Sequence, residues 1–184
     1  QALSDWDDHC SGVETQLDDL FSRLAPVPFL LEKLDRCILS EEELADAASP
    51  ALADIRRKIL RSGQRLRETL DKMVRNQDVQ KCLQDARVTM RDGRFVLPVK
   101  AEHRGQVQGL IHDTSASGQT LFIEPLAVVE ANNDMRLLES LEQEEIERII
   151  TELCADCGTW ADAIIADHAV CAELNLYFAQ VCFW

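Results

Sequence analysis

Apolar residues recur along residues 51–85 at the spacing of one helix face. They are separated by steps of 3, 4, 7, 4 and 3 residues, and the first proline after them is Pro98. The stripe consists of Leu52, Ile55, Ile59, Leu66, Leu70 and Met73. A heptad-like stripe predicts a helix that packs against a partner along its length. At about 1.5 Å per residue, such a helix would be about 50 Å long.

A second apolar stripe begins at Leu138, and no proline follows Pro125. Its members are Leu138, Leu141, Ile146, Ile149, Leu153, Cys157, Trp160 and Ile164. An unbroken helix here would reach about 80 Å, and Cys157-Gly158 is a candidate bend. The chain must reverse between the two stripes, so the two helices are expected to run antiparallel.

Between the stripes the pattern changes to strands. Residues 88–90 alternate apolar and polar, and Asp92-Gly93 separates them from the β-prone run 94–99. Asp-Gly between two such runs is a strong hairpin signal, because both turn positions favour positive φ. Two further strands are expected near residues 107–111 and 120–123.

These patterns give a fold class that is mainly α with a small antiparallel β insertion. Residues 1–50 are expected to form two or three short helices, with a break at Pro26-Val27-Pro28 and a capping box at Ser40–Glu43. The predicted segments are a helical core segment (1–50), a first long helix (51–86), the β insertion (87–125) and a returning helix with the core end (126–184).

Charge is distributed unevenly along the chain, whose net charge is −14. Residues 1–53 carry −9, residues 54–125 carry +5 and residues 126–184 carry −10. No apolar run is long enough to span a membrane, and the first residues are acidic where a signal peptide would be basic. We therefore expect a cytoplasmic protein with no membrane partner, whose seven cysteines are reduced thiols.

Two groups of residues have the composition of chemical sites. Cys154, Cys157, His168 and Cys171 have zinc-ligand types and spacings. On a continuous helix, however, Cys157 and His168 would lie about 16 Å apart, so buried thiols are the favoured interpretation and no metal is expected. His112, Asp113 and Ser115 match a hydrolase triad in type only, because adjacent strand residues point to opposite faces. No catalytic residue is predicted.

Four stretches of the middle region resemble the Smr-bearing MutS paralogue family of bacteria. They are Leu83-Gln84-Asp85, residues 92–102 (DGRFVLPVKAE), residues 112–125 (HDTSASGQTLFIEP) and residues 128–133 (VVEANN). The resemblance is strongest over residues 81–135 and looser over about 49–180. It implies that the long helices are the MutS lever and that the β insertion is a four-stranded clamp at its tip.

The resemblance also implies functions for the full-length protein. Members of this family are homodimeric ATPases that use ATP and Mg²⁺ and carry a C-terminal Smr nuclease domain. They act on branched DNA in suppression of recombination or on collided ribosomes, and so on rRNA. No glycine of this chain precedes a lysine, as a phosphate-binding loop requires. The chain is therefore expected to be a non-catalytic binding and mechanical element without a cofactor of its own.

Basic residues of the β insertion are the candidate nucleic-acid contacts. They are Arg91, Arg94, Lys100, His103 and Arg104. Arg and Lys neutralise phosphates, and no base-reading arrangement is evident. The alternative is that they pair with Asp92, Glu102 and Asp113 on an exposed sheet. The corresponding alternative function is a purely structural coiled-coil module for dimerisation or protein contacts.

Overall fold

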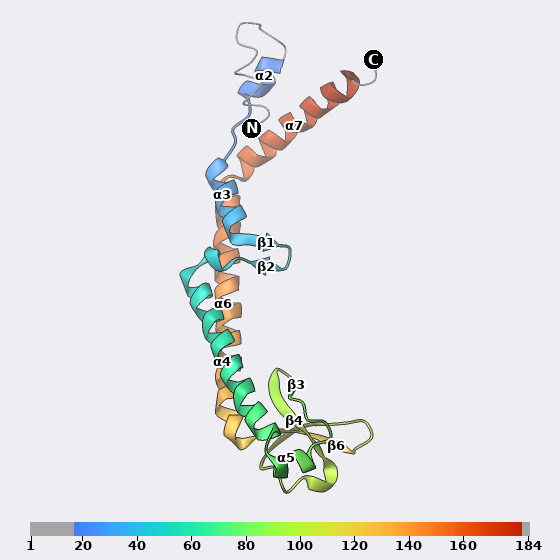
Figure 1. Cartoon of the computed structure of the whole chain (residues 1–184). Helices are drawn as coiled ribbons and strands as arrows, with labels where there is room; N and C mark the ends of the chain where they lie inside the picture. Colours follow the sequence, from blue (N-terminus) through green and yellow to red (C-terminus); the bar gives the residue numbers. More distant parts are fainter. Residues whose placement is uncertain (1–16, 182–184) are drawn as a thin grey trace. The chain divides into compact units, whose positions relative to one another are not determined.

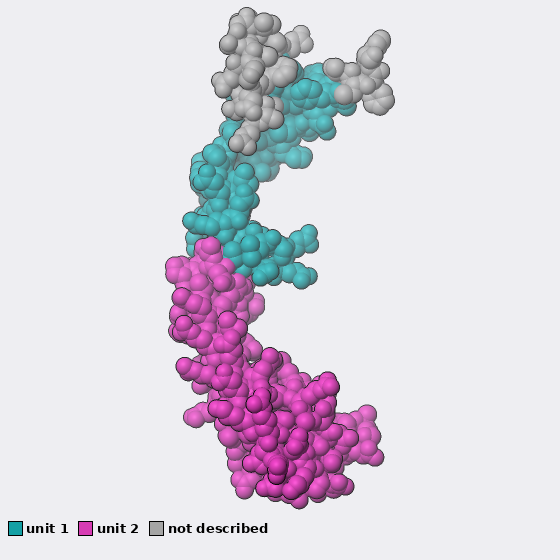
Figure 2. All heavy atoms as spheres, viewed as in Figure 1, with its two compact units in different colours: residues 1–45, 150–184 teal, residues 46–149 magenta. Residues whose placement is uncertain are grey.

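The structure, a computed structural model, describes residues 17–181. Helices dominate, with two small antiparallel sheets, so the expected fold class is confirmed (Figure 1). The chain divides into two compact units (Figure 2). One, the sheet unit, comprises residues 46–149, and the other, the α7 unit, comprises residues 1–45 and 150–184. Among the described residues, no helix is long and apolar enough to cross a membrane.

Helix α4 (Pro50–Val74) is the first long element of the sheet unit. Its N-cap is Ser49, whose Oγ accepts hydrogen bonds from the amides of Ala51 and Leu52. The same Oγ donates to Oε1 of Glu145 at 2.6 Å. The start of α4 is therefore attached to a residue almost a hundred positions later in the chain.

The expectation of one helix over residues 51–85 is wrong beyond Val74. Helix α4 ends there, and a separate short helix, α5 (Gln77–Cys82), follows. Asn76 lies between them with extended backbone, and its side chain accepts a hydrogen bond from the amide of Asp78. Asparagine side chains compete with helical hydrogen bonding and favour N-caps, which explains the interruption.

Four antiparallel strands follow in the order β3-β4-β6-β5. Their bounds are β3 Thr89–Arg91, β4 Arg94–Lys100, β5 Gly109–Thr114 and β6 Thr120–Pro125. Asp92 and Gly93 both have positive φ, 48° and 72°, which confirms the predicted hairpin turn. Short 3-10 turns, η2 (Ala101–His103) and η3 (Leu126–Val128), follow β4 and β6.

Helix α6 (Val129–Thr159) runs antiparallel to α4 within the sheet unit. Ser49 contacts Glu145, whereas Arg56, further along α4, contacts Glu142 through Nε at 2.7 Å. Arg56 also pairs with Asp46 at 2.7 Å, and Asp46 and then Glu142 raise the pKa of its guanidinium. The predicted antiparallel arrangement of the two helices is thus confirmed for this unit, whereas Leu141 of the second apolar stripe is 40% exposed.

The core of the sheet unit lies between these helices and one face of the sheet. Leu66 and Leu70 of α4 are buried there, as are Val128 and Met135 on the α6 side. Ile59 and Met73 of the predicted stripe are partly buried against the same core, as the periodicity indicated. From the sheet, the buried members are Phe95, Leu97, Val99, Leu121 and Ile123.

The α7 unit begins with α2 (Leu17–Ser22) and α3 (Pro28–Cys37). Residues 1–16, on which part of the first predicted helix falls, lie outside the described residues. The capping box predicted at residues 40–43 is wrong, because a hairpin of β1 (Ile38–Ser40) and β2 (Glu43–Leu44) occupies this position. The Ser40 hydroxyl accepts from the Glu42 amide within the turn, a local bond that competes with helix formation.

The second long helix is also interrupted. Helix α6 ends at Thr159, and α7 (Ala161–Val181) begins two residues later. The Thr159 hydroxyl donates to the carbonyl oxygen of Ala155, a bond that bends helices. Trp160, at the break, packs edge-on against Phe29 with ring centroids 5.4 Å apart. The break therefore lies two residues beyond Gly158, the candidate bend.

Candidate nucleic-acid interface

The register of the sheet divides its side chains between two faces. Residues 97, 99, 121 and 123 face the helical core, since successive strand residues alternate in direction. On the opposite face, the residues relevant to a site are Arg91, Arg94, Lys100, Phe122 and Glu124. Three of the five predicted contact residues are therefore on the face that does not pack against α4.

Arg94 is committed to a buried carboxylate. Glu124 is 0% exposed, and Nη1 of Arg94 donates to its Oε1 at 2.8 Å, while the Arg94 side chain is only 16% exposed. Nη2 of Arg94 donates to Oδ1 of Asn133 at 2.8 Å. Nε2 of His112 lies within hydrogen-bonding distance of Oε2 of Glu124.

Asn132, at 0% exposed, completes both this network and the sheet. Its Nδ2 donates to Oε1 of Glu124 at 2.7 Å and to the carbonyl of Phe95 at 3.1 Å, and its Oδ1 accepts from the amide of Phe95 at 3.0 Å. Extending the β4–β6 register places Pro125 opposite Phe95, and proline has no amide hydrogen. The Asn132 carboxamide supplies the partners that the strand lacks at this position.

Arg91 lies on the same face at the hairpin end of the sheet. Its guanidinium carbon is 4.2 Å from the centroid of the Phe122 ring, and its Nε is 3.4 Å from Oδ2 of Asp113. The pairing with Asp113 is the one that the alternative interpretation expected. The side chain remains 42% exposed, so it keeps access to a ligand in solvent.

Lys100, His103 and Arg104 form a second group at the far end of β4. Nζ of Lys100 donates to the carbonyl oxygen of Lys81 at 3.3 Å, and Nε2 of His103 is 3.5 Å from Oε1 of Glu102. Arg104 is exposed, and no salt bridge joins it to a carboxylate within residues 17–181. This end of the sheet therefore presents two cations whose charge is not matched by a directly bonded acid.

The five predicted contact residues do not form one site. Lys100 lies six positions after Arg94 along β4, which corresponds to about 20 Å at about 3.3 Å per residue. Arg91 and Arg94 are register partners at one end, and Lys100, His103 and Arg104 lie at the other. Whether any of them contacts phosphate remains a prediction. Of the five, Arg94 has the most hydrogen bonds to other residues of the chain, namely to Glu124 and Asn133.

Sequence reasoning missed Glu124 and Asn132 as organising residues. Glu124 is the one acid in the run from Leu121 to Pro125, all of which is buried. A carboxylate in an otherwise apolar strand needs a buried partner, so this position carried a usable signal. The identity of the partners did not, because Arg94, His112 and Asn132 come from three different elements.

The residues of the notional triad are occupied separately. His112 contacts Glu124, Oδ1 of Asp113 accepts from the amide of Thr114, and Oγ of Ser115 accepts from the amide of Thr120. For zinc, Cys154 and Cys157 lie on α6 whereas Cys171 lies on α7. The expectation that these thiols are buried is wrong, because Cys154 and Cys171 are exposed and Cys157 is only partly buried. Residues 17–181 contain no grouping of three metal-ligating side chains. That no metal binds stays a prediction.

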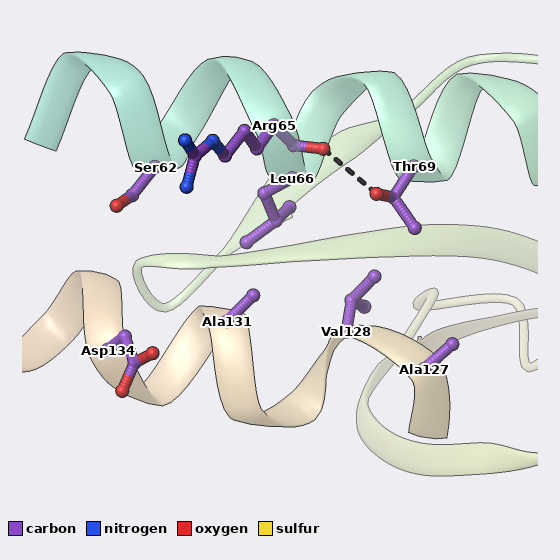
Figure 3. Close-up of a pocket in the computed structure, with 8 residues that line it drawn as sticks. All are labelled: Ser62, Arg65, Leu66, Thr69, Ala127, Val128, Ala131 and Asp134. Carbon is purple, nitrogen blue, oxygen red and sulfur yellow. Dashed lines mark hydrogen bonds between the residues drawn. The ribbon is translucent and has the colours of Figure 1, made fainter.

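A small cavity of about 200 Å³ lies between α4 and the start of α6. Figure 3 shows that α4 contributes one side of the cavity and that η3 and α6 contribute the other. The lining residues are Ser62, Arg65, Leu66, Thr69, Ala127, Val128, Ala131 and Asp134. Thr69 donates its hydroxyl hydrogen to the Arg65 carbonyl, so it is already satisfied. The cavity reflects the small side chains where the helices meet.

No protein-family model matches the chain. Among curated proteins, the chain is similar to Endonuclease MutS2 of Ruminiclostridium cellulolyticum, with 47% identity over 162 residues, 88% of this chain and 20% of the relative. Endonuclease MutS2 of Agathobacter rectalis is 47% identical over 91% of this chain and 21% of its own length. That of Alkaliphilus oremlandii is 41% identical over 95% and 22%.

The chain thus spans about a fifth of the length of the curated relatives it matches. The alignments cover nearly all of this chain, including the strands and both flanking helices. The residues that build the Glu124 network belong to the stretches that carry the resemblance to the Smr-bearing MutS paralogues. Taken together, the matches show that the chain belongs, as a segment, to the MutS2 family.

Proposed function

We propose that this segment is the lever and clamp module of a MutS-type ATPase and that its β sheet engages nucleic-acid-bearing substrates. The substrates would be branched DNA, in suppression of recombination, or collided ribosomes through their rRNA. The full-length protein would be a cytoplasmic homodimer that binds ATP and Mg²⁺ and carries a nuclease domain. The name of the relatives, Endonuclease MutS2, supports the nuclease part of this proposal.

One observation carries the proposal: a rigidly held sheet presents unmatched positive charge. The Glu124 network joins β4, β5, β6 and the first turns of α6, so the sheet is fixed to the helices that support it. Among the described residues, no acid is directly bonded to Lys100 or Arg104, which lie at the far end of the sheet. A fixed sheet with free cations is suited to holding a phosphate backbone, which demands charge and position but not base reading.

This segment itself is proposed to be non-catalytic. Its residues do not fit an ATP–Mg²⁺ site, because none of its seven glycines precedes a lysine in a phosphate-binding loop. Its role would be to transmit the nucleotide state of an ATPase elsewhere in the full-length protein. The test is to purify the segment by two independent routes and assay each preparation. ATP hydrolysis or nucleic-acid cleavage by both preparations would contradict this part of the proposal.

The test is binding of a four-way DNA junction and of ribosomes by K100A/R104A protein. We expect weaker binding and a log–log salt slope flatter by about 0.7 to 0.9 for each lost phosphate contact. Arg94 is left in place, because its removal would leave the buried Glu124 carboxylate without its cation. R23A/R36A, which removes the same charge from exposed positions of the α7 unit, is the matched control. Equal effects of the two variants would contradict the proposal.

A second function is favoured by a separate observation. Helix α7 exposes large apolar side chains on several sides, including Ile165 (67% exposed) and Leu176 (59%). This surface supports the alternative of a structural module for dimerisation or protein contacts. Sedimentation of the chain distinguishes the nucleic-acid module from the structural module. A dimer whose mass changes neither with salt nor on addition of nucleic acid would favour the structural module.

A further inference from the structure

Helix α4 has a second face that its packing does not use. At 100° per residue, Leu52, Leu66 and Leu70 share the buried side of the helix. Five basic residues lie within about 100° of arc on the opposite side. These residues, called the α4 basic face, are Arg57, Lys58, Arg61, Arg65 and Lys72. All five are exposed, and the face extends for about 23 Å at about 1.5 Å per residue.

Much of this charge has no counterion among the described residues. Lys58 is 2.7 Å and Arg57 is 3.5 Å from oxygens of Asp54, whose pKa is lowered first by the hydrogen bond to Lys58. No salt bridge joins Arg65 or Lys72 to a carboxylate within the described part of the chain. Arg61 contributes only a longer-range interaction with Asp54. Three exposed cations on one face of one helix therefore remain without a bonded acid.

The concentration of positive charge on this helix contrasts with the rest of the chain. Helix α4 contains seven Lys and Arg against three Asp and Glu, whereas its antiparallel neighbour α6 contains two against nine. One ion pair, between Arg56 of α4 and Glu142 of α6, joins the two oppositely charged helices. Joining them does not need the outer face, because Arg61 and Lys72 lie away from the packed side, and Arg65 lies at its margin beside the cavity. The outer charges are thus left for a ligand.

We propose that the α4 basic face binds the phosphate backbone of a nucleic-acid duplex, as a surface additional to the sheet. A duplex carries about one negative charge per 1.7 Å of its axis, so about 23 Å of it offers more phosphates than this face has cations. The inference rests on the proposed function, since it assumes that the module meets nucleic acid. The α4 basic face is a second contact surface, and it contains none of the sheet residues.

The packing of α4 determines how the duplex is held. A B-DNA major groove, about 12 Å wide, admits a single α-helix of 10–12 Å diameter. Helix α4 is packed on its opposite side against α6 and the sheet, so it does not enter the groove as an isolated helix. Contact is therefore with the backbone and independent of base sequence. Salt dependence, and not sequence preference, is the property to measure.

The experiment compares three variants of the 184-residue chain. R61Q/R65Q/K72Q removes the unpaired cations of the α4 basic face, and Gln is close to Arg and Lys in helix propensity. R23Q/R36Q/R136Q removes the same charge from other exposed positions. K100A/R104A removes the sheet cations. The probes are labelled 30-base-pair DNA and RNA duplexes and poly-glutamate, titrated from low to moderate salt, with circular dichroism as the folding check.

We expect R61Q/R65Q/K72Q to bind duplex more weakly than the R23Q/R36Q/R136Q control, with a log–log salt slope flatter by about 0.9 per lost contact on DNA. Equal loss in both triple variants would overturn the inference, because net charge alone would then explain it. Loss of poly-glutamate binding without loss of duplex binding would also overturn it and would indicate an acidic protein partner.

The same titrations separate this inference from the proposed function. If K100A/R104A weakens duplex binding and R61Q/R65Q/K72Q does not, the α4 face is refuted and the sheet interface stands. If R61Q/R65Q/K72Q weakens binding and K100A/R104A does not, the α4 face stands and the sheet contact is refuted. If the unmodified chain binds no duplex even at low salt, both are refuted.

Discussion

The two units of this chain differ in how much of their apolar surface they bury. The sheet unit has a core of thirteen buried residues that joins α4, the sheet and α6. In the described part of the α7 unit, the cluster between α2 and α7 has three buried members: Leu20, Val170 and Leu174. Most of the large exposed apolar side chains also belong to the α7 unit, including Phe29, Ile165 and Leu176.

This difference teaches that stability is unequally distributed along the chain. Burial of apolar surface contributes about 25 cal/mol per Å², so the sheet unit should hold most of the folding free energy. Two transitions are expected on unfolding, with the α7 unit first. The probes are separable, because all three tryptophans lie outside residues 46–149 in sequence. Tryptophan fluorescence reports the α7 unit, and amide hydrogen exchange in β4 and β6 reports the sheet unit.

The largest effect is expected from E124Q. Gln keeps the shape of the side chain but removes the charge that faces Arg94, whose guanidinium is 16% exposed. Removing one partner of a buried ion pair costs about 3–5 kcal/mol of unfolding free energy. Urea titration followed by circular dichroism and by hydrogen exchange in β4 should show this loss in the sheet transition, with the fluorescence transition little changed.

The control for that experiment is E130Q, which removes an exposed carboxylate from the first turn of α6. A double variant, R94M/E124L, should recover part of the lost stability, since no buried charge is then left unpaired. Equal destabilisation by E124Q and E130Q would mean that the network does not stabilise the sheet unit.

A smaller loss is expected from L70A. Leu70 is fully buried at the centre of the sheet-unit core, and removing such a side chain costs about 2–5 kcal/mol. L60A, on the exposed side of the same helix, should change the unfolding free energy by less than about 0.5 kcal/mol. Fluorescence reports the α7 unit, and hydrogen exchange in β4 and β6 reports the sheet unit. If L70A destabilises both units equally by these two probes, the units unfold together and the comparison between them fails.

The smallest effect concerns acid. A hydrogen bond from Arg148, and then one from Ser49, lower the pKa of Glu145 from 4.5 to about 2. A lowered carboxylate pKa stabilises the fold above pH 4.5, and this contribution is lost as the pH falls toward 2. After allowance for solvent screening it is about 1–2 kcal/mol. E145Q should therefore flatten the pH dependence of the sheet transition in this window, with E144Q as the matched control.

Features determined by neighbouring residues were predictable from the sequence. The positive φ of Asp92 and Gly93 follows from the Asp-Gly pair itself, and the burial of Leu52, Leu66 and Leu70 follows from helical periodicity. The end of α4 near Asn76 is also determined by neighbouring residues. The sequence did not predict it, because the helical apolar pattern continues past Asn76. The hairpin at residues 38–44 was hidden because its short turn has the same residues as a capping box.

The polar network was not predictable in the same way. Glu124 attracts attention as an acid among apolar neighbours, but nothing nearby in sequence says that Arg94, His112 and Asn132 would surround it. The sequence placed Arg94 among exposed phosphate contacts, and its pairing with the buried Glu124 carboxylate could be recognised only once the register of β4 and β6 was known. Long-range pairing of this kind depends on how strands from different parts of the chain are brought together.

The hydrogen bonds of Asn132 restrict rotation of α6 about its own axis. Its carboxamide is held in one orientation, because its oxygen accepts from the Phe95 amide and its nitrogen donates to the Phe95 carbonyl and to Glu124. A turn of α6 about its axis by one residue, about 100°, would remove that carboxamide from β4. Torque applied along α6 must therefore either carry the sheet with it or break three buried hydrogen bonds together. The proline at residue 125 is the reason that the strand accepts a helix residue as its partner at all.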